Sequence, residues 1–246
     1  MKLYCIQVGS FEIPPQFIAH KVTNGEVPTL LPIFAYLVEH PDGLVVVDLG
    51  QHYDLRDDGS RFEKEDTIVA KLLELGYKPD DIKYVVLSHM HLDHAGYMCD
   101  FPNSTFIVRH EELKAAWWPN RTFEQGYVYK TYEMTRAFDF IEPLDNENFD
   151  VFGDGKVVLI DTKGHSRGHQ SMVLNLQNTG KVVVVCDAAP MREVIDKKLV
   201  PGTCADTLEA MRSIDKLLHL EATGHKLIIA HDPKNMPEKV FPEYFD

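Results

Sequence analysis

The most informative segment of this chain is Ser88-His89-Met90-His91-Leu92-Asp93-His94-Ala95-Gly96. It follows the apolar run Tyr84-Val85-Val86-Leu87, which predicts a buried β-strand. Three histidines and one aspartate therefore stand together just past a strand end. Imidazole and carboxylate groups are ligands of divalent metals of the zinc type, and packing alone does not explain such a density of them. The segment predicts a metal site.

Length, charge and hydropathy limit the classes to which this protein can belong. The chain has 246 residues and a formal net charge of −13, and no Gly/Ser linker divides it, so we expect one domain over residues 1–246. An acidic surface repels phosphate backbones, which disfavours nucleic acid and favours a small-molecule substrate. No apolar run is long enough to cross a bilayer, and the start of the chain lacks a secretion signal, so we expect no membrane association and a cytoplasmic protein.

Alternating strand and helix signals, with several hairpins, predict an α/β fold of layers with mixed sheets. One hairpin is expected around His40-Pro41-Asp42-Gly43 and a second around Gln177-Asn178-Thr179-Gly180. Residues 1–8 read as an edge strand. A helix is expected over 65–75, ending at Gly76.

A later helix is predicted after Thr203 or Asp206, either of which can cap it. Its expected buried stripe is Leu208, Met211, Asp215 and Leu218.

The middle stretch, about 111–150, combines many aromatic residues with many charges. It is expected to be a helical insertion with one apolar face. That face either packs in the core, forms a dimer surface, or caps the substrate.

Three later strands are each followed by a potential metal ligand. The strand 157–161 leads to His165, the strand 182–186 to Asp187, and the strand 227–230 to His231. Functional groups gather where strand ends open into loops. The candidate metal ligands are therefore His89, His91, Asp93, His94, His165, Asp187 and His231. One zinc takes about four ligands, so seven ligands and water suit two metals that share a bridge.

The pattern His-x-His-x-Asp-His over 89–94, followed by His165, Asp187 and His231, resembles the metallo-β-lactamase superfamily. The resemblance covers nearly the whole chain and implies an αββα sandwich of two mixed sheets flanked by helices, with two metals at one edge of the sheets. His91 at the second ligand position is similar to the zinc-type hydrolases rather than to the diiron oxidoreductases.

Within that superfamily the chain looks most like the quorum-quenching N-acyl-homoserine lactonases. The likeness lies in residues 31–39, 94–96, 164–171, 231–233 and 240–244. There are two departures. Asp187-Ala188-Ala189-Pro190 has Pro190 where those lactonases usually carry a tyrosine that contacts the substrate carbonyl, and the charged loop 51–66 is short for one that cradles an acyl chain. The implied activity is the opening of a lactone ring, with the acyl-chain preference left open.

The resemblance also implies roles for the ligands. His89, His91 and His165 would hold one metal, Asp93, His94 and His231 the other, and Asp187 would bridge them. The implied metals are two zinc ions, with manganese, iron or cobalt as alternatives, and the implied nucleophile is a metal-bridging hydroxide. Asp93 is the implied catalytic residue, which carries a proton to the leaving oxygen. Tyr97 is a candidate substitute for the missing tyrosine, and Asp48 and His169 are candidate partners of the ligands.

Other activities share this ligand pattern and remain alternatives. A thioesterase of the glyoxalase II kind needs basic groups for a glutathione carboxylate, and no clear basic cluster is seen. A phosphodiesterase is disfavoured by the acidic composition. A non-catalytic metal-binding protein on the same scaffold is expected to have lost ligands, and this chain keeps all of them. Either a monomer or a homodimer is compatible with the sequence.

Overall fold

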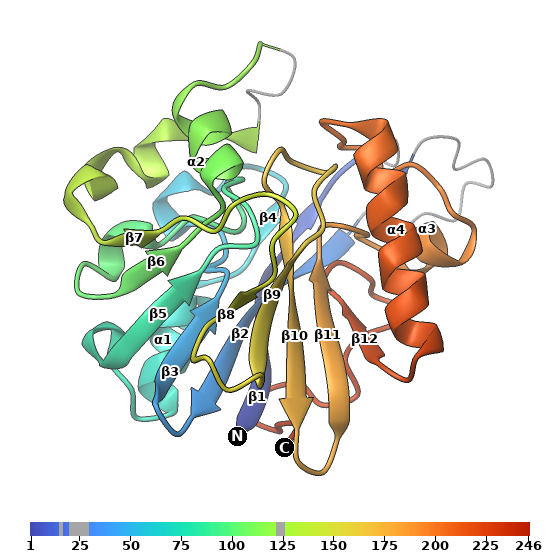
Figure 1. Ribbon diagram of the computed structural model, residues 1–246. Coiled ribbons are helices and arrows are strands. Elements are labelled where there is room, and N and C mark those ends of the chain that lie inside the picture. Colours follow the sequence, from blue (N-terminus) through green and yellow to red (C-terminus); the bar gives the residue numbers. More distant parts are fainter. Residues whose placement is uncertain (15–16, 20–29, 122–125) are drawn as a thin grey trace.

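Two mixed β-sheets pack face to face, with helices on their outer faces (Figure 1). This computed structural model describes residues 1–14, 17–19, 30–121 and 126–246. The arrangement is the αββα sandwich that the sequence predicts, and it places one apolar layer between the sheets and one outside each sheet.

The first sheet has seven strands in the order β4-β1-β2-β3-β5-β6-β7. Their bounds are β1 Lys2–Glu12, β2 Leu30–His40, β3 Gly43–Val47, β4 Ser60–Arg61, β5 Ile82–Val86, β6 Thr105–Ile107 and β7 Phe140–Ile141. The predicted hairpin joins β2 and β3, which pair antiparallel, whereas β3, β5, β6 and β7 run parallel.

The prediction that residues 1–8 form an edge strand is partly right. Over these residues β1 pairs with only one strand of the described chain, β2, because β4 pairs with Ser10 and Phe11. The end of the chain covers their other side, because Leu3 N–H donates to the carbonyl of Phe245 at 2.8 Å and Phe241 N–H to the carbonyl of Cys5 at 2.8 Å. These contacts occupy backbone groups that an edge would leave exposed.

The second sheet has five strands in the order β12-β11-β10-β9-β8. Their bounds are β8 Phe149–Asp150, β9 Val157–Asp161, β10 Gln170–Leu176, β11 Gly180–Cys186 and β12 Lys226–Ile229. The predicted second hairpin joins β10 and β11, and β12 lies parallel to β11.

Apolar side chains from both faces of the strands form three buried clusters. Phe34 and Tyr36 of the first sheet meet Leu174 and Val184 of the second sheet in the central cluster. Strands buried on both faces read as continuous apolar runs, which is the pattern seen in the sequence.

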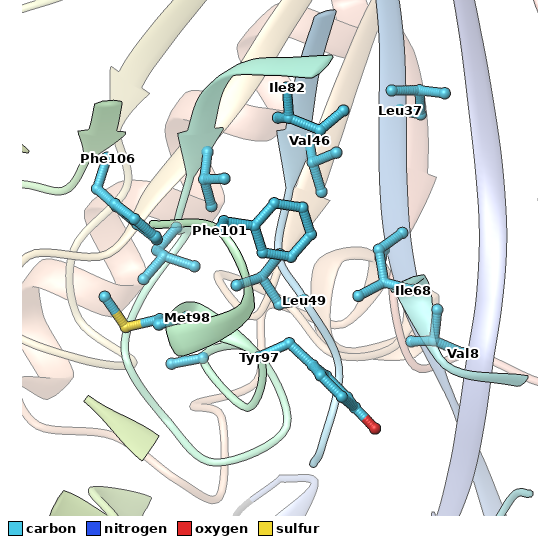
Figure 2. Packing of buried hydrophobic residues seen from close by; sticks show 14 of the residues in the cluster. Val8, Leu37, Val46, Leu49, Ile68, Ile82, Tyr97, Met98, Phe101 and Phe106 are labelled. Atoms are coloured by element: carbon cyan, nitrogen blue, oxygen red, sulfur yellow. The ribbon is translucent and has the colours of Figure 1, made fainter. Parts of the chain in front are cut away.

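The outer clusters hold helices against the sheets. On the first sheet, Ile68 and Leu72 of α1 (Ile68–Glu74) belong to one buried cluster with Val8 and Leu37. Figure 2 shows Ile68 beside Val8 in that cluster. On the second sheet, the outer cluster joins Val183 and Ile229 to α3 (Arg192–Asp196) and α4 (Thr207–Ala222). The remaining helices of the described residues are α2 His110–Trp117 and the 3-10 turns η2 Tyr53–Leu55, η3 Lys64–Asp66, η4 Pro79–Asp81, η5 Met98–Asp100, η7 Tyr129–Thr131 and η8 Glu133–Ala137.

The cap predicted for α4 is confirmed, but the predicted buried stripe is only half right. Asp206 accepts hydrogen bonds from the N–H groups of Leu208 and Glu209. Met211 and Leu218 are partly buried against the outer cluster, whereas Leu208 and Asp215 are exposed. The fully buried residues of the helix are Ala210, Ser213, Ile214 and Leu217. The Ser213 hydroxyl donates to the carbonyl of Lys163 at 2.7 Å, and this polar anchor lies on the buried face. An apolar pattern alone does not reveal such an anchor.

The stretch 111–150 contains most of α2, the turns η7 and η8, and the strands β7 and β8, while its residues 122–125 lie outside the described part. The rings of Trp117, Tyr129 and Tyr132 pack edge to face, and the Tyr132 hydroxyl donates to the carbonyl of Ala116 at 2.7 Å. These aromatics serve packing. Trp118 differs, because it is 79% exposed and lines the cavity described below. The assignment of the whole chain as one domain with an insertion stays a prediction.

Within the described ranges, no helix combines the length and the apolar character that crossing a bilayer requires.

Candidate metal centre

The seven predicted ligands converge, although they come from four separate segments of the chain. They form three overlapping groups in which the ligand atoms lie within 4.8 Å of one another: His89-His91-His165, His89-His94-Asp187 and Asp93-His94-His231. The segment after β5 supplies four of these residues, and the segments after β9, β11 and β12 supply one each. α2 and the start of α4 lie at the end of the sandwich remote from the chain termini (Figure 1).

The first group is a triangle of imidazole nitrogens. Nε2 of His89 lies 3.0 Å from Nδ1 of His91, and Nε2 of His165 lies 3.1 Å from each of them. A tetrahedral zinc with bonds of about 2.0–2.1 Å separates its nitrogen ligands by about 3.3–3.4 Å. The triangle is therefore close to the size that one metal ion needs.

The second group surrounds Nε2 of His94, which lies 3.3 Å from Oδ2 of Asp93. Nε2 of His231 lies 3.8 Å from the same carboxylate oxygen. Asp187 stands between the two groups: its Oδ2 lies 3.5 Å from Nε2 of His165, and its Oδ1 lies 2.9 Å from Nε2 of His231. The two oxygens of one carboxylate thus face different groups.

The ring nitrogens that point away from the centre are held by neighbours. Nδ1 of His165 lies 3.1 Å from the carbonyl of Thr203, and Nδ1 of His231 lies 2.6 Å from the carbonyl of Pro32. A carbonyl only accepts, so Nδ1 carries the hydrogen in both rings and Nε2 presents its lone pair to the centre. The sequence gives no sign of these two carbonyls, because every residue has one.

Buried polar atoms converge at the centre, which is a test of whether the residues fit a metal. Nε2 of His94, Oδ1 of Asp187 and Nε2 of His231 are buried, and among the described residues they face only one another and Oδ2 of Asp93. Buried polar atoms are costly unless paired. Converging nitrogen and oxygen atoms without donors suit a cation, so the donor set fits divalent metals.

The local electrostatics divide the ligands into two kinds. Burial holds the pKa of His89 and His165 below the ordinary value and lowers the pKa of His91 to about 3, so these rings stay neutral. Burial opposes ionisation of Asp93, but His94 and His231 outweigh it and lower the pKa of Asp93 to about 2. Burial also opposes a charge on His94 and His231, but Asp93 and Asp187 outweigh it and raise the pKa of both rings. Metal binding needs neutral imidazoles and ionised carboxylates, so it would release the protons of these two rings.

The two candidate partners of the ligands lie where they can orient them. Oδ2 of Asp48 lies 2.8 Å from Nδ1 of His94, and Asp48 also accepts from the backbone N–H and the hydroxyl of Ser88. His169 accepts a hydrogen bond from the N–H of Asp187 at 3.1 Å. Asp48 has a φ of 57° and Cys186, just before Asp187, a φ of 50°. This left-handed backbone is uncommon for residues with side chains, and it occurs where β3 and β11 end beside the centre.

Glu112 of α2 is a buried carboxylate at the centre that the sequence reasoning missed. It is 0% exposed and accepts four hydrogen bonds. Burial raises its pKa, and the donors oppose that shift. His110-Glu111-Glu112 reads as an ordinary acidic first turn of a helix, so no signal in the sequence distinguishes Glu112 from Glu111, which is only half-buried.

The centre opens into a cavity of about 970 Å³. His91, Asp93, His165, Asp187 and His231 lie in its wall, together with apolar side chains that include Phe11, Ile13, Phe17, Leu31 and Trp118. Such a mixture of apolar surface and a few polar groups is typical of small-molecule sites.

The missing tyrosine is not replaced by Tyr97. Pro190 lines the cavity wall and offers no hydroxyl, whereas Tyr97 is not among the lining residues. Tyr97 lies beside Met98 in the outer cluster of the first sheet (Figure 2), and its hydroxyl accepts from the N–H of Tyr53 at 2.9 Å.

The sequence is similar to known proteins along its whole length. The sequence model of the metallo-beta-lactamase superfamily matches residues 28–231. The N-acyl homoserine lactonase AttM of Azorhizobium caulinodans is 31% identical over 261 residues, which cover 100% of this chain and 99% of that protein. The N-acyl homoserine lactonase AiiA of Bacillus thuringiensis subsp. kurstaki is 30% identical over 262 residues, covering 99% of this chain and 98% of that protein.

Solved structures agree with the sequence relatives. A quorum-quenching N-acyl homoserine lactone lactonase superposes with a TM-score of 0.86 at 29% identity, covering 99% of this chain and 97% of that one. An N-acyl homoserine lactone hydrolase with the product N-hexanoyl-L-homoserine bound at its catalytic metal centre has a TM-score of 0.84 at 28% identity, covering 99% and 98%. The superfamily match spans most of the sequence and the relatives match it from end to end, so this protein belongs to the metallo-beta-lactamase superfamily, and its relatives there are N-acyl homoserine lactonases.

Proposed function

We propose that this protein is a metal-dependent hydrolase that opens a lactone ring, with an N-acyl homoserine lactone or a related small lactone as substrate. Such an activity would quench quorum signals. The observation that carries the proposal is Asp187, whose two carboxylate oxygens face the two ligand groups at 3.5 and 2.9 Å in the wall of a substrate-sized cavity. End-to-end similarity to lactonases supports the same substrate class.

The proposed cofactors are two divalent metal ions. His89, His91 and His165 would hold one, Asp93, His94 and His231 the other, and Asp187 would contact both. Zinc is the preferred metal, since imidazole and carboxylate ligands suit it, with manganese, iron or cobalt as alternatives. When bound, such metals lower the pKa of water toward about 7 and polarise a carbonyl oxygen.

The side chains of the cavity would bind the substrate and move its protons. The apolar wall, including Phe17 and Trp118, would hold an acyl chain. Asp93 reaches the cavity from the ligand segment, so it is the proposed proton carrier to the leaving ring oxygen. Because Pro190 offers no donor for the substrate carbonyl, the bound metals would have to polarise that carbonyl without help from this position.

Metal analysis combined with a panel of substrates tests the proposal. The panel comprises lactones of several acyl-chain lengths, S-lactoylglutathione, a phosphodiester and a β-lactam. The expected result is about two metals per chain and turnover of at least one lactone. Turnover of the thioester or of the phosphodiester alone would assign the corresponding alternative activity instead. Metal binding without any turnover would favour a non-catalytic role.

Two further proposals concern the location and the oligomeric state of the protein. We propose that the protein works in the cytoplasm, which cell fractionation tests. We also propose that it is a monomer or a homodimer, which light scattering of the purified chain tests.

A further inference from the structure

We propose that Glu112 is a positioning residue that holds the segment of His89 and His91 and the loop of His165 at the spacing one metal ion requires. The inference rests on the proposed metal site but concerns a residue outside the ligand set. It gives a function to a fully buried carboxylate that neither the cavity nor the seven ligands explain.

The contacts of Glu112 join three separate segments of the chain. Oε1 accepts from the N–H of Met90 at 2.9 Å and from the hydroxyl of Tyr127 at 3.0 Å. Oε2 accepts from the hydroxyl of Ser166 at 2.7 Å and from the N–H of Gly168 at 2.9 Å. One rigid carboxylate on α2 therefore binds both of the loops that carry the first ligand group.

These partners are the immediate neighbours of the ligands. Met90 stands between His89 and His91, so a shift of its backbone would move both rings. Ser166 directly follows His165. The three ligand nitrogens lie within 3.1 Å of one another, and a metal tolerates little change in that spacing.

Close packing supports the same role. A Cβ atom at Gly168 would lie 2.4 Å from the backbone nitrogen of Glu112, so the loop approaches α2 as closely as only glycine allows. The ring of Tyr127 lies edge-on to His91, with centroids 4.9 Å apart. Through the Tyr127 hydroxyl, Glu112 thus also fixes the wall beside His91.

The geometry calls for a carboxylate rather than an amide. Four donors face two oxygens, and an ionised carboxylate has enough lone pairs for all of them. A glutamine of the same shape has one carbonyl oxygen, and its NH₂ group would face two donors. Glu112→Gln therefore disrupts the four hydrogen bonds while it preserves the volume of the side chain.

The decisive experiment compares Glu112→Gln with the unmodified chain by metal content, competition with a chelator, and the visible spectrum of the cobalt(II)-substituted protein. We expect a fall from about two metals to about one, with affinity at the first group weaker by about ten- to a hundredfold. We also expect an altered cobalt spectrum. The matched control is Glu74→Gln, an exposed glutamate of α1 paired with Lys71, which should leave all three readouts unchanged.

Milder variants keep the proposal falsifiable if Glu112→Gln does not fold. Ser166→Ala and Tyr127→Phe each delete one donor, and each should weaken metal binding several-fold. Ile214→Val destabilises the outer cluster of the second sheet without touching the centre, so it should lower the melting temperature and leave metal affinity unchanged.

The outcomes separate the two proposals. If the unmodified chain binds no metal, the proposed function fails. The role of Glu112 alone is overturned by a different result. In that case the unmodified chain binds two metals, and Glu112→Gln binds them with equal affinity and an unchanged cobalt spectrum. The same holds if both milder variants do so.

Discussion

Oδ2 of Asp48 lies 2.8 Å from Nδ1 of His94, and this contact joins the end of β3 to the ligand segment after β5. Both side chains are buried, and burial opposes a charge on His94, but Asp93, Asp187 and Asp48 together raise its pKa well above the ordinary value. Asp48 therefore orients the His94 ring and increases its basicity toward the centre.

Replacing Asp48 with asparagine should weaken metal binding at the second group. Asp48→Asn keeps the size of the side chain and removes the charge, and such changes beside a ligand cost about ten- to a hundredfold in metal affinity. Chelator competition followed by metal analysis measures the effect. Asp215→Asn, at an exposed aspartate of α4, is the control and should bind metal normally. Equal affinities of the two variants would contradict the prediction.

Removal of a ligand that faces both groups should abolish binding and activity together. We expect Asp187→Ala to lose metal from both groups, because its oxygens face His165 and His231. His91→Ala should lose the metal of the first group and the activity. Metal content and lactone turnover are measured on the same samples. Full hydrolysis by either variant would show that the assigned ligands are wrong.

Metal removal should lower the stability of the folded chain. A ligand present at about a thousandfold above its dissociation constant stabilises the folded state by about 4 kcal/mol, and each kcal/mol shifts the melting temperature of a chain of about this length by about 2–4 °C. Calorimetry before and after chelation should therefore show a fall of roughly 10 °C. His91→Ala should show a smaller fall, and an equal one would mean that the stabilising metal binds elsewhere.

An added methyl group at Gly168 should disturb the loop of His165. The new Cβ would lie 2.4 Å from the nitrogen of Glu112 and 2.7 Å from its Cβ, and backbone atoms cannot give way cheaply. We expect Gly168→Ala to lose about 1–3 kcal/mol in free energy of unfolding, together with metal affinity. Gly224 lies at a turn with open space around it. Gly224→Ala should therefore lower the free energy of unfolding only through backbone strain, and it should leave the metal content unchanged. Denaturant unfolding and metal analysis separate the two.

The stabilisation by Asp161 should depend on pH. Burial raises the pKa of Asp161, but the N–H groups of Lys163 and Asn146 and the charge of Arg109 outweigh it, and the net pKa is below the ordinary value. A carboxyl with a depressed folded-state pKa stabilises above its unfolded pKa of about 3.9 and loses that contribution as pH falls through the folded value. Asp161→Asn should be less stable than the unmodified chain at pH 7, with a difference that shrinks below about pH 4. A difference independent of pH would contradict the assignment.

The strands and the ligand types could be predicted from local sequence. Strands buried on both faces, such as β3 and β11, require unbroken apolar runs, and turns such as His40-Pro41-Asp42-Gly43 require their particular residues. The cap at Asp206 is equally local. The buried face of α4 was predicted only in part, for Met211 and Leu218, because the side on which a helix packs depends on the sheet and loop beneath it.

The residues that hold and orient the ligands could not be predicted from the sequence for the same reason. Pro32 and Thr203 act through backbone carbonyls, and Glu112 differs from Glu111 only in where the helix turns it. Tyr97 follows the ligand segment closely in sequence, yet its hydroxyl accepts a hydrogen bond from the N–H of Tyr53.

By itself, the sequence determined the chemistry of this protein: which side chains can bind a metal, and that apolar strands end beside them. Only the tertiary structure decided that Asp187 lies between two ligand groups, that Glu112 ties two ligand loops together, and that Pro190 rather than a tyrosine faces the cavity. The physical reason is that ligand identity is a property of single residues, whereas ångström-scale spacing depends on how segments up to about 200 residues apart pack against one another.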